Sequence, residues 1–269
     1  MPSDRRALCV GINQFPFAPQ LKTLAGCVND AHDMAGVLRD WVGFSPGDIT
    51  ILTDQQATKA NIMGALSSMV AEATGGGVKY LVFSLSSHGT QVVDFNNDEP
   101  DGKDEAFCTY NAAATPQGFW DANTLIVDDE LRDLFLKLPL DVLVEVYLDT
   151  CHSGTGLRGA KRVARYAPPP SPKAIRSLAR VEVRGTMRGA LRGDSRHHIL
   201  WSACRDSQQS FDASFGGRPN GAFTYNWTKA MRESQNTLSR RQILERVREG
   251  LLAGNFRQEP QLQANATLT

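Results

Sequence analysis

A cysteine and a histidine stand just beyond two strongly apolar runs, and together they could carry out nucleophilic catalysis. Cys151 follows "DVLVEVYLD", and His88 comes shortly after "KYLVFSL". An imidazole can accept the proton of a thiol, and the thiolate can then attack a carbonyl carbon. By residue type alone, a cysteine at a strand end is more often a small buried residue. The chemistry therefore depends on whether the fold brings His88 to Cys151.

The apolar runs alternate with amphipathic segments, as in α/β proteins. We expect strands at residues 7–12, 48–52, 79–85, 141–149 and 197–204, and a short one within 258–265. We expect helices at residues 26–44, 57–73, 128–138, 221–233 and 239–251. Strands that are apolar throughout, separated by helices, indicate a mostly parallel central sheet of about six strands with helices on both faces.

Ligands of such a sheet bind beyond the carboxyl ends of its strands. Neighbouring strands lie only about 4.8 Å apart, so Cys151 and His88 can meet across a wide separation in sequence. Three other histidines are poorer candidates for the base. His152 adjoins the cysteine, but consecutive side chains usually diverge. His197 and His198 begin a strand instead of ending one, which places them at the opposite edge of the sheet. The small residue Gly89 lets backbone N–H groups approach an oxyanion.

Composition excludes several classes of protein. The chain has 269 residues, with 29 basic and 29 acidic side chains, and this balance predicts no general affinity for nucleic acid. No apolar run reaches the roughly 18 residues of a membrane span. Five scattered cysteines without a C-x-x-C pair argue against a disulfide framework and a structural zinc site. We expect a cytoplasmic protein without a signal peptide.

One segment, 158–196, departs from the α/β pattern. It carries eleven basic residues against two acidic ones and contains "APPPSP", which no helix or strand interior tolerates. It could be a solvated loop or a nucleic-acid arm, although Tyr166 is its only aromatic residue for stacking on bases. It could also be a linker open to proteolysis.

Four stretches together resemble metacaspases, the caspase-like cysteine peptidases. They are "LAGCVNDA", "SLSSHGTQ", "LDTCHSG" and the region 201–227. The resemblance runs from about Arg6 to Ala264 and implies a caspase-like fold and a type I-like or bacterial catalytic unit without a pro-domain. It divides the chain into a large-subunit-like part (1–157), the basic linker (158–196) and a small-subunit-like part (197–269). Family members are typically monomeric.

The resemblance assigns His88 and Cys151 as the catalytic dyad. The backbone N–H groups of Gly89 and Cys151 are then expected to bind the oxyanion. The reaction would pass through a thioester acyl-enzyme that water hydrolyses.

The resemblance also assigns a substrate pocket to Asp30, Ser86 and Asp149. Two carboxylates beside the nucleophile would repel an aspartate side chain and hold an arginine or lysine. Alone, Asp30 could be a surface charge of its helix, and Asp149 a cap of the following turn.

These residues predict a cysteine endopeptidase that cuts proteins or peptides after Arg or Lys, with no nucleic-acid or membrane partner. The basic linker offers such an enzyme many of its own preferred sites, so we expect self-cleavage of a zymogen somewhere between Arg158 and Arg196. The alternative is a catalytically silent caspase-like scaffold that binds partners through the same cleft.

Calcium is a possible activator. By its composition, the acidic run from Asp94 to Phe107 is expected to be a loop, and acidic loops supply the oxygen ligands that calcium prefers. The ligand positions of calcium-dependent relatives match Asp104, Asp128 and Asp129. A fourth ligand position falls where this chain has Arg158, whose positive charge weakens the site. Asp128 and Asp129 could instead stabilise the N-terminus of a helix. We expect no cofactor to be required for the chemistry.

Overall fold

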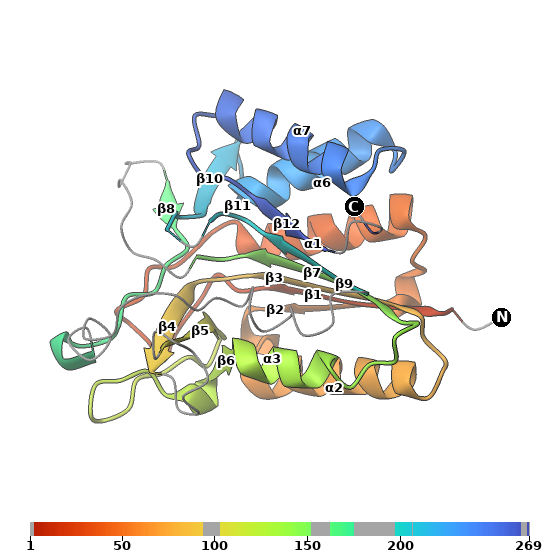
Figure 1. Ribbon diagram of the computed structural model, residues 1–269. Helices are drawn as coiled ribbons and strands as arrows, with labels where there is room; N and C mark the ends of the chain where they lie inside the picture. The colour runs from red at the N-terminus through yellow and green to blue at the C-terminus, as the bar shows by residue number, and fades with distance from the viewer. Residues whose placement is uncertain are drawn as a thin grey trace.

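A six-stranded sheet forms the centre of the molecule in the computed structural model, which describes residues 3–93, 103–151, 162–174, 197–205, 207–264 and 268 (Figure 1). Its strand order is β12-β9-β7-β3-β1-β2, and all neighbours pair in parallel except β12 with β9. The strands are β1 (Arg5–Gly11), β2 (Ile49–Thr53), β3 (Tyr80–Ser86), β7 (Leu143–Asp149), β9 (His198–Ser202) and β12 (Gln261–Gln263).

Helices cover both faces of this sheet (Figure 1). One face carries α1 (Cys27–Val37), α6 (Ala222–Ser234) and α7 (Arg240–Ala253), and the other carries α2 (Lys59–Thr74) and α3 (Asp128–Phe135). Short helical turns span Leu38–Val42, Pro46–Asp48, Asp54–Gln56 and Ala122–Thr124. The adjacent residues Val82 and Phe83 of β3 belong to two different apolar cores, as expected for a strand buried on both sides.

Two smaller sheets lie at the end of the central sheet opposite the N-terminus (Figure 1). One is made by β4 (Gly89–Val93), β5 (Lys103–Cys108) and β6 (Leu125–Val127), and the other by β8 (Val163–Ala164), β10 (Phe211–Phe215) and β11 (Arg218–Gly221). Gly216 and Gly217 join β10 to β11 with φ angles of 60° and 87°, which suit a tight hairpin turn.

The predicted fold class is confirmed: the central sheet has six strands, is mostly parallel and has helices on both faces. One prediction was wrong. The acidic run from Asp94 to Phe107 reads as a loop by composition, but its last residues form β5, because pairing with β4 and β6 buries Ala106 and Phe107 completely. The part of the chain that the structure describes contains no helix long and apolar enough to cross a membrane.

A buried glutamate ties the two parts of the chain together near the amino ends of the strands. Glu145 of β7 accepts hydrogen bonds from Tyr80 (2.7 Å), the Trp201 indole (2.7 Å) and the Arg240 guanidinium (2.9 and 2.8 Å). Burial alone would raise the pKa of Glu145, but Arg240 and the other donors lower it below its usual value. Glu145 is therefore a structural anion between β3, β9 and α7.

We predict that Glu145→Ala destabilises the fold by roughly 3 kcal/mol or more. The substitution removes the carboxylate that accepts from the partly buried Arg240 guanidinium, the Tyr80 hydroxyl and the Trp201 indole. Urea unfolding followed by far-UV circular dichroism measures this loss. Asp141→Ala removes an exposed ion pair with Lys79 and should change little. Equal stability of the two variants would contradict the structural role of Glu145.

Candidate functional site

The register of the central sheet brings Cys151 and His88 to the same edge. Ser86 of β3 lies opposite Asp149 of β7 in the parallel ladder. His88 comes two positions after Ser86, and Cys151 comes two positions after Asp149. Both side chains are buried, with 1% of their surface exposed. The two strands are neighbours, as the sequence predicts.

The His88 ring is fixed by one hydrogen bond. Its Nε2 lies 2.7 Å from the Lys22 carbonyl oxygen, which can only accept, so Nε2 carries the proton and Nδ1 is the basic nitrogen. Nδ1 is buried and makes no hydrogen bond to the described residues. Burial lowers the pKa of His88 to about 4, and the bond to Lys22 offsets this only in part. The ring is therefore a neutral base at neutral pH.

The Cys151 thiol is covered in the intact chain. Burial raises its pKa to about 12, although a hydrogen bond with the Ser210 backbone and the Arg165 guanidinium lower it somewhat. Burial and then the nearby Cys151 raise the pKa of Tyr166. The segment around Arg165 and Tyr166 thus lies against the thiol and keeps it protonated.

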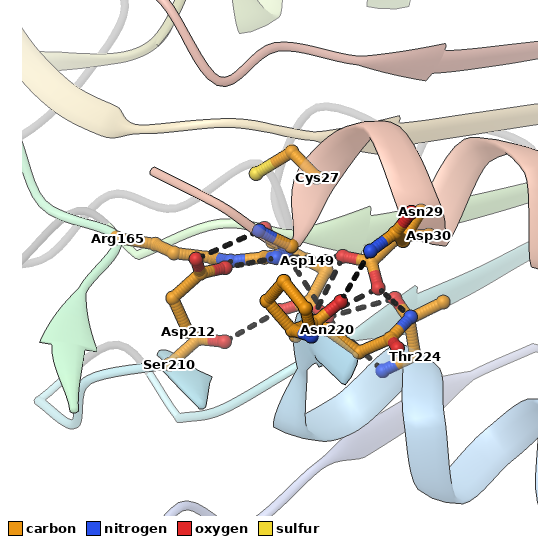
Figure 2. Close-up of polar contacts among 12 residues, drawn as sticks. Cys27, Asn29, Asp30, Asp149, Arg165, Ser210, Asp212, Asn220 and Thr224 are labelled. Atoms are coloured by element: carbon orange, nitrogen blue, oxygen red, sulfur yellow. Dashed lines mark hydrogen bonds and ion pairs between the residues drawn. The ribbon is translucent and has the colours of Figure 1, made fainter. Parts of the chain in front are cut away.

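Three carboxylates, those of Asp30, Asp149 and Asp212, form a pocket that the Arg165 guanidinium fills (Figure 2). Arg165 Nη2 lies 2.6 Å from Asp30 and 2.7 Å from Asp212, and Nη1 lies 3.2 Å from Asp149. Nη1 also donates to the Asp149 carbonyl oxygen at 3.0 Å. No part of the Arg165 side chain is exposed. The pocket therefore satisfies one arginine from several directions.

Other donors hold Asp149 and Asp30 in place (Figure 2). Asp149 accepts from the backbone N–H of Thr224 at 3.0 Å and from its hydroxyl at 2.7 Å. Asp30 accepts from the Asn220 amide at 2.9 Å and from the backbone N–H of Gly221 at 3.0 Å. A Cβ on Gly221 would stand 2.2 Å from an Asp149 oxygen and 2.5 Å from Arg165 Nη1, so only glycine fits this wall of the pocket.

Asp212 is held by the chain just before α1. It accepts from the backbone N–H groups of Ala25 at 2.7 Å and Gly26 at 2.8 Å. Burial alone would raise the pKa of Asp212, but Arg165 and these N–H groups lower it below its usual value. By contrast, burial raises the pKa of Asp30 to about 7 despite the attraction of Arg165. Partial protonation of Asp30 at neutral pH therefore removes part of the excess negative charge that three carboxylates bring to the pocket.

The backbone of Arg165 also has defined partners. Its carbonyl oxygen accepts from the N–H of Gly89 at 2.9 Å and from the N–H of Cys151 at 3.3 Å. Its own N–H donates to the Ser210 carbonyl at 3.0 Å. Two N–H groups converging on one carbonyl oxygen form the arrangement that stabilises a developing oxyanion. They are the two groups that the sequence predicts for that role.

The residues around Arg165 run across the site as an extended strand. On its amino side, Val163 and Ala164 pair antiparallel with β10. On its carboxyl side, Ala167 donates to the Gly89 carbonyl at 2.8 Å and accepts from the Thr90 hydroxyl at 2.7 Å. The segment therefore lies across the carboxyl ends of β3 and β7 and is held on both sides by hydrogen bonds of the kind made by an added strand.

Two pocket residues, Asp212 and Arg165, were not predicted from the sequence. Asp212 lies on β10, within the region 201–227 that carries the resemblance, but nothing in its local pattern separates it from an ordinary strand residue. Arg165 is one of many similar linker residues. Ser86 is buried beside Asp149 in the ladder, and among its described contacts no hydrogen bond to Arg165 is found.

The residues predicted to bind calcium lie around the small sheet of β4, β5 and β6. Asp104 is on β5, and Asp128 and Asp129 begin α3, where Asp129 pairs with Arg132 at 2.6 Å. Within the described residues, no group of three or more histidine, cysteine or acidic side chains could hold a metal ion. The calcium site stays a prediction, because residues 94–102 and Arg158 lie outside the described residues.

Comparisons with known proteins identify the family. The caspase domain model matches residues 4–269. A metacaspase-1 of Yarrowia lipolytica is 32% identical over 97% of this chain, and a metacaspase-1 of Ajellomyces capsulatus is 31% identical over 98%. The chain spans 61% of the length of the first relative and 80% of the second.

Solved structures agree on the fold. A Geobacter sulfurreducens crystal structure superposes with a TM-score of 0.66 at 24% identity, covering 97% of this chain and 92% of that one. Caspase-1 of Spodoptera frugiperda superposes with a TM-score of 0.57 at 11% identity, covering 97% of this chain and 88% of that one. The chain belongs to the caspase family of cysteine peptidases. Within that family its relatives are metacaspases, as its sequence motifs predict.

We predict that Cys151 is poorly reactive in the intact chain and becomes reactive when the linker is released. Arg165→Ala removes the side chain that anchors the linker, so iodoacetamide at pH 7.5 should alkylate Cys151 at least tenfold faster. Peptide mapping by mass spectrometry measures the rate at each cysteine.

Cys9 provides an internal control for the alkylation experiment. Burial in the central sheet also raises its pKa to about 12, and its strand β1 is separated by β3 from β7, the strand that leads to Cys151. Its rate should stay low in both proteins. Equal rates at Cys151 with and without Arg165 would show that the linker does not cover the thiol.

Proposed function

We propose that this peptidase cleaves after arginine, with Cys151 as nucleophile and His88 as base, and that its first substrate is its own Arg165–Tyr166 bond. One observation carries the proposal. The same residue places its guanidinium among three carboxylates and its carbonyl oxygen between two N–H donors beside the cysteine. A substrate residue on the amino side of a cut requires both features together.

The proposed reaction forms a thioester with Cys151 and then hydrolyses it. His88 Nδ1 takes the thiol proton, and Sγ of Cys151 attacks the Arg165 carbonyl carbon. The N–H groups of Gly89 and Cys151 stabilise the negative oxygen of the tetrahedral intermediate. The C–N bond to Tyr166 breaks while His88 returns the proton to the leaving amine. Water, deprotonated by His88, then hydrolyses the thioester and restores the thiol.

The pocket favours arginine over lysine. The Nε, Nη1 and Nη2 atoms of Arg165 reach the carboxylates of Asp212, Asp149 and Asp30, respectively. A guanidinium is a planar fork of five donors, whereas an ammonium is a single compact point that cannot reach three carboxylates in the same way. An acidic side chain would meet only negative charge. We therefore expect the order Arg, then Lys, with no cleavage after Asp.

Peptide substrates test this specificity in a chain whose own linker is released. The Arg162→Gln, Arg165→Gln double variant, called the open variant here, lacks the arginines that hold the described linker segment to the cleft. Asp212→Asn in the open variant should lower kcat/KM for an Arg fluorogenic peptide by about 10²–10³-fold, because it removes one partner of a buried ion pair. Lys peptides should lose less, and Asp peptides should stay uncut in every variant.

Asp33→Asn is the matched control. Asp33 lies three residues after Asp30 on α1, almost one helical turn away, and pairs with Arg218 and Arg232 instead of Arg165. It should leave kcat/KM nearly unchanged. Equal losses at Asp33 and Asp212, or faster cleavage after Asp than after Arg, would contradict the proposed pocket.

Self-cleavage should occur between Arg165 and Tyr166. Intact-mass analysis of denatured wild type should give fragments 1–165 and 166–269, with a half-time independent of protein concentration. Cys151→Ala should remain whole, and Arg165→Gln should lose this cut.

Arg176→Gln provides the control for a charge lost elsewhere in the linker. It should cut at Arg165 like wild type. A wild-type chain that is cut only after another linker arginine would overturn the assignment of Arg165. No step of the proposed reaction uses calcium; assays with added calcium and with a chelator test whether the ion changes the rate.

A further inference from the structure

A second linker arginine has its own binding site. Arg162 stands three residues before Arg165, and its guanidinium carbon lies 4.0 Å from the centre of the Phe256 ring. Nη1 donates to the Asn255 carbonyl at 2.7 Å, and Nη2 donates to the Gly254 carbonyl at 2.9 Å. A cation over an aromatic face that also has two acceptors at its edge is held in place as well as attracted.

The acceptors belong to the end of a helix. Helix α7 ends at Ala253, and Gly254 and Asn255 follow it directly. The C-terminal end of a helix carries a partial negative charge and unsatisfied carbonyl groups, so it favours a cation. This site therefore attracts a guanidinium without any acidic side chain.

The aromatic floor of the site is packed against other rings. Phe256 is only 6% exposed and lies 5.9 Å from Phe215 of β10, centre to centre. Phe215 in turn stacks on Tyr225 of α6 at 3.9 Å. The ring that meets Arg162 is thus supported by two neighbouring elements and is part of the folded core.

Strand pairing fixes the distance between the two arginine sites. Val163 and Ala164 connect them and pair with Asp212 and Phe211 of β10. Successive side chains of a strand point to opposite faces, so a shift by one residue would turn a side chain away from its site. A peptide can fill both sites only with arginines three positions apart.

The sequence contains this spacing once. Of the chain's 21 arginines, only Arg162 and Arg165 are separated by three positions. The arginines from Arg176 to Arg196 follow one another at intervals of four. The two-site requirement would therefore select Arg165 among the many basic residues of the linker.

We propose that Gly254, Asn255 and Phe256 form a second specificity site, which binds an arginine three residues before the cleaved position. The preferred substrate is then Arg-x-x-Arg, cut after the second arginine. This inference rests on the proposed function, which supplies the first arginine pocket. It adds a recognition element from the small-subunit-like part of the chain.

Binding measurements test the second site without requiring catalysis. Cys151→Ala in the open variant is titrated with fluorescein-labelled Arg-Val-Ala-Arg and Ala-Val-Ala-Arg, and fluorescence anisotropy gives each Kd. We expect the first peptide to bind about tenfold more tightly. Arg-Ala-Val-Ala-Arg has the same charge as the first peptide with its arginine one position further away, and it should bind like the alanine peptide.

Phe256→Leu removes the aromatic face but keeps an apolar side chain of similar size. It should abolish the preference for Arg-Val-Ala-Arg and leave the Kd of Ala-Val-Ala-Arg unchanged. Equal Kd values for all three peptides in the unsubstituted background would overturn the second site, as would a preference that survives Phe256→Leu.

Kinetics of the open variant with Cys151 intact separate this inference from the proposed function. If both fluorogenic peptides are cut equally well, the first pocket stands and the second site is wrong. If neither peptide is cut although Arg-Val-Ala-Arg binds more tightly, the second site stands as a binding site and the proposed function fails.

Discussion

The buried guanidinium of Arg165 is the interaction on which the site depends. Its three carboxylate partners come from α1, the end of β7 and β10, so the pocket exists only when the two parts of the chain are assembled. Removing one partner from such a buried cluster leaves an uncompensated charge, which is strongly unfavourable. An empty pocket has to take up water or protons. The unfavourable free energy of three carboxylates without a cation explains why the Arg165 guanidinium occupies the pocket in the structure.

Occupation of the pocket has a chemical consequence for the dyad. The segment that satisfies the carboxylates also covers Cys151 and His88, and burial favours the neutral form of both groups. A neutral thiol is a poor nucleophile, so the contacts that align the bond also hold back its attack. Departure of the segment would expose both groups to water and reverse these shifts. In the proposed function, the linker segment is therefore both the first substrate and the cover of the thiol, through one set of contacts.

The sequence is sufficient to predict the site residues that stand at the ends of the central strands. Cys151, His88 and Asp149 stand at the carboxyl ends of apolar strands, where parallel topology concentrates function. Asp212 could not be found in this way, because it lies on a short strand whose partner β8 is within the linker. Arg165 has the same composition context as its neighbours, and only the contacts of its side chain and backbone single it out. The strand β5 was missed because pairing with two neighbours outweighs its acidic composition.

The shared central sheet determines what cutting the linker can achieve. Strand β7 precedes the linker and β9 follows it, yet they pair over five consecutive residue positions, from Val144 with His198 to Leu148 with Ser202. Glu145 adds a bond to Arg240 across the same boundary. A chain broken after Arg165 therefore remains one folded body held by backbone pairing. The proposed cleavage would create two new termini beside Cys151 without dividing the molecule.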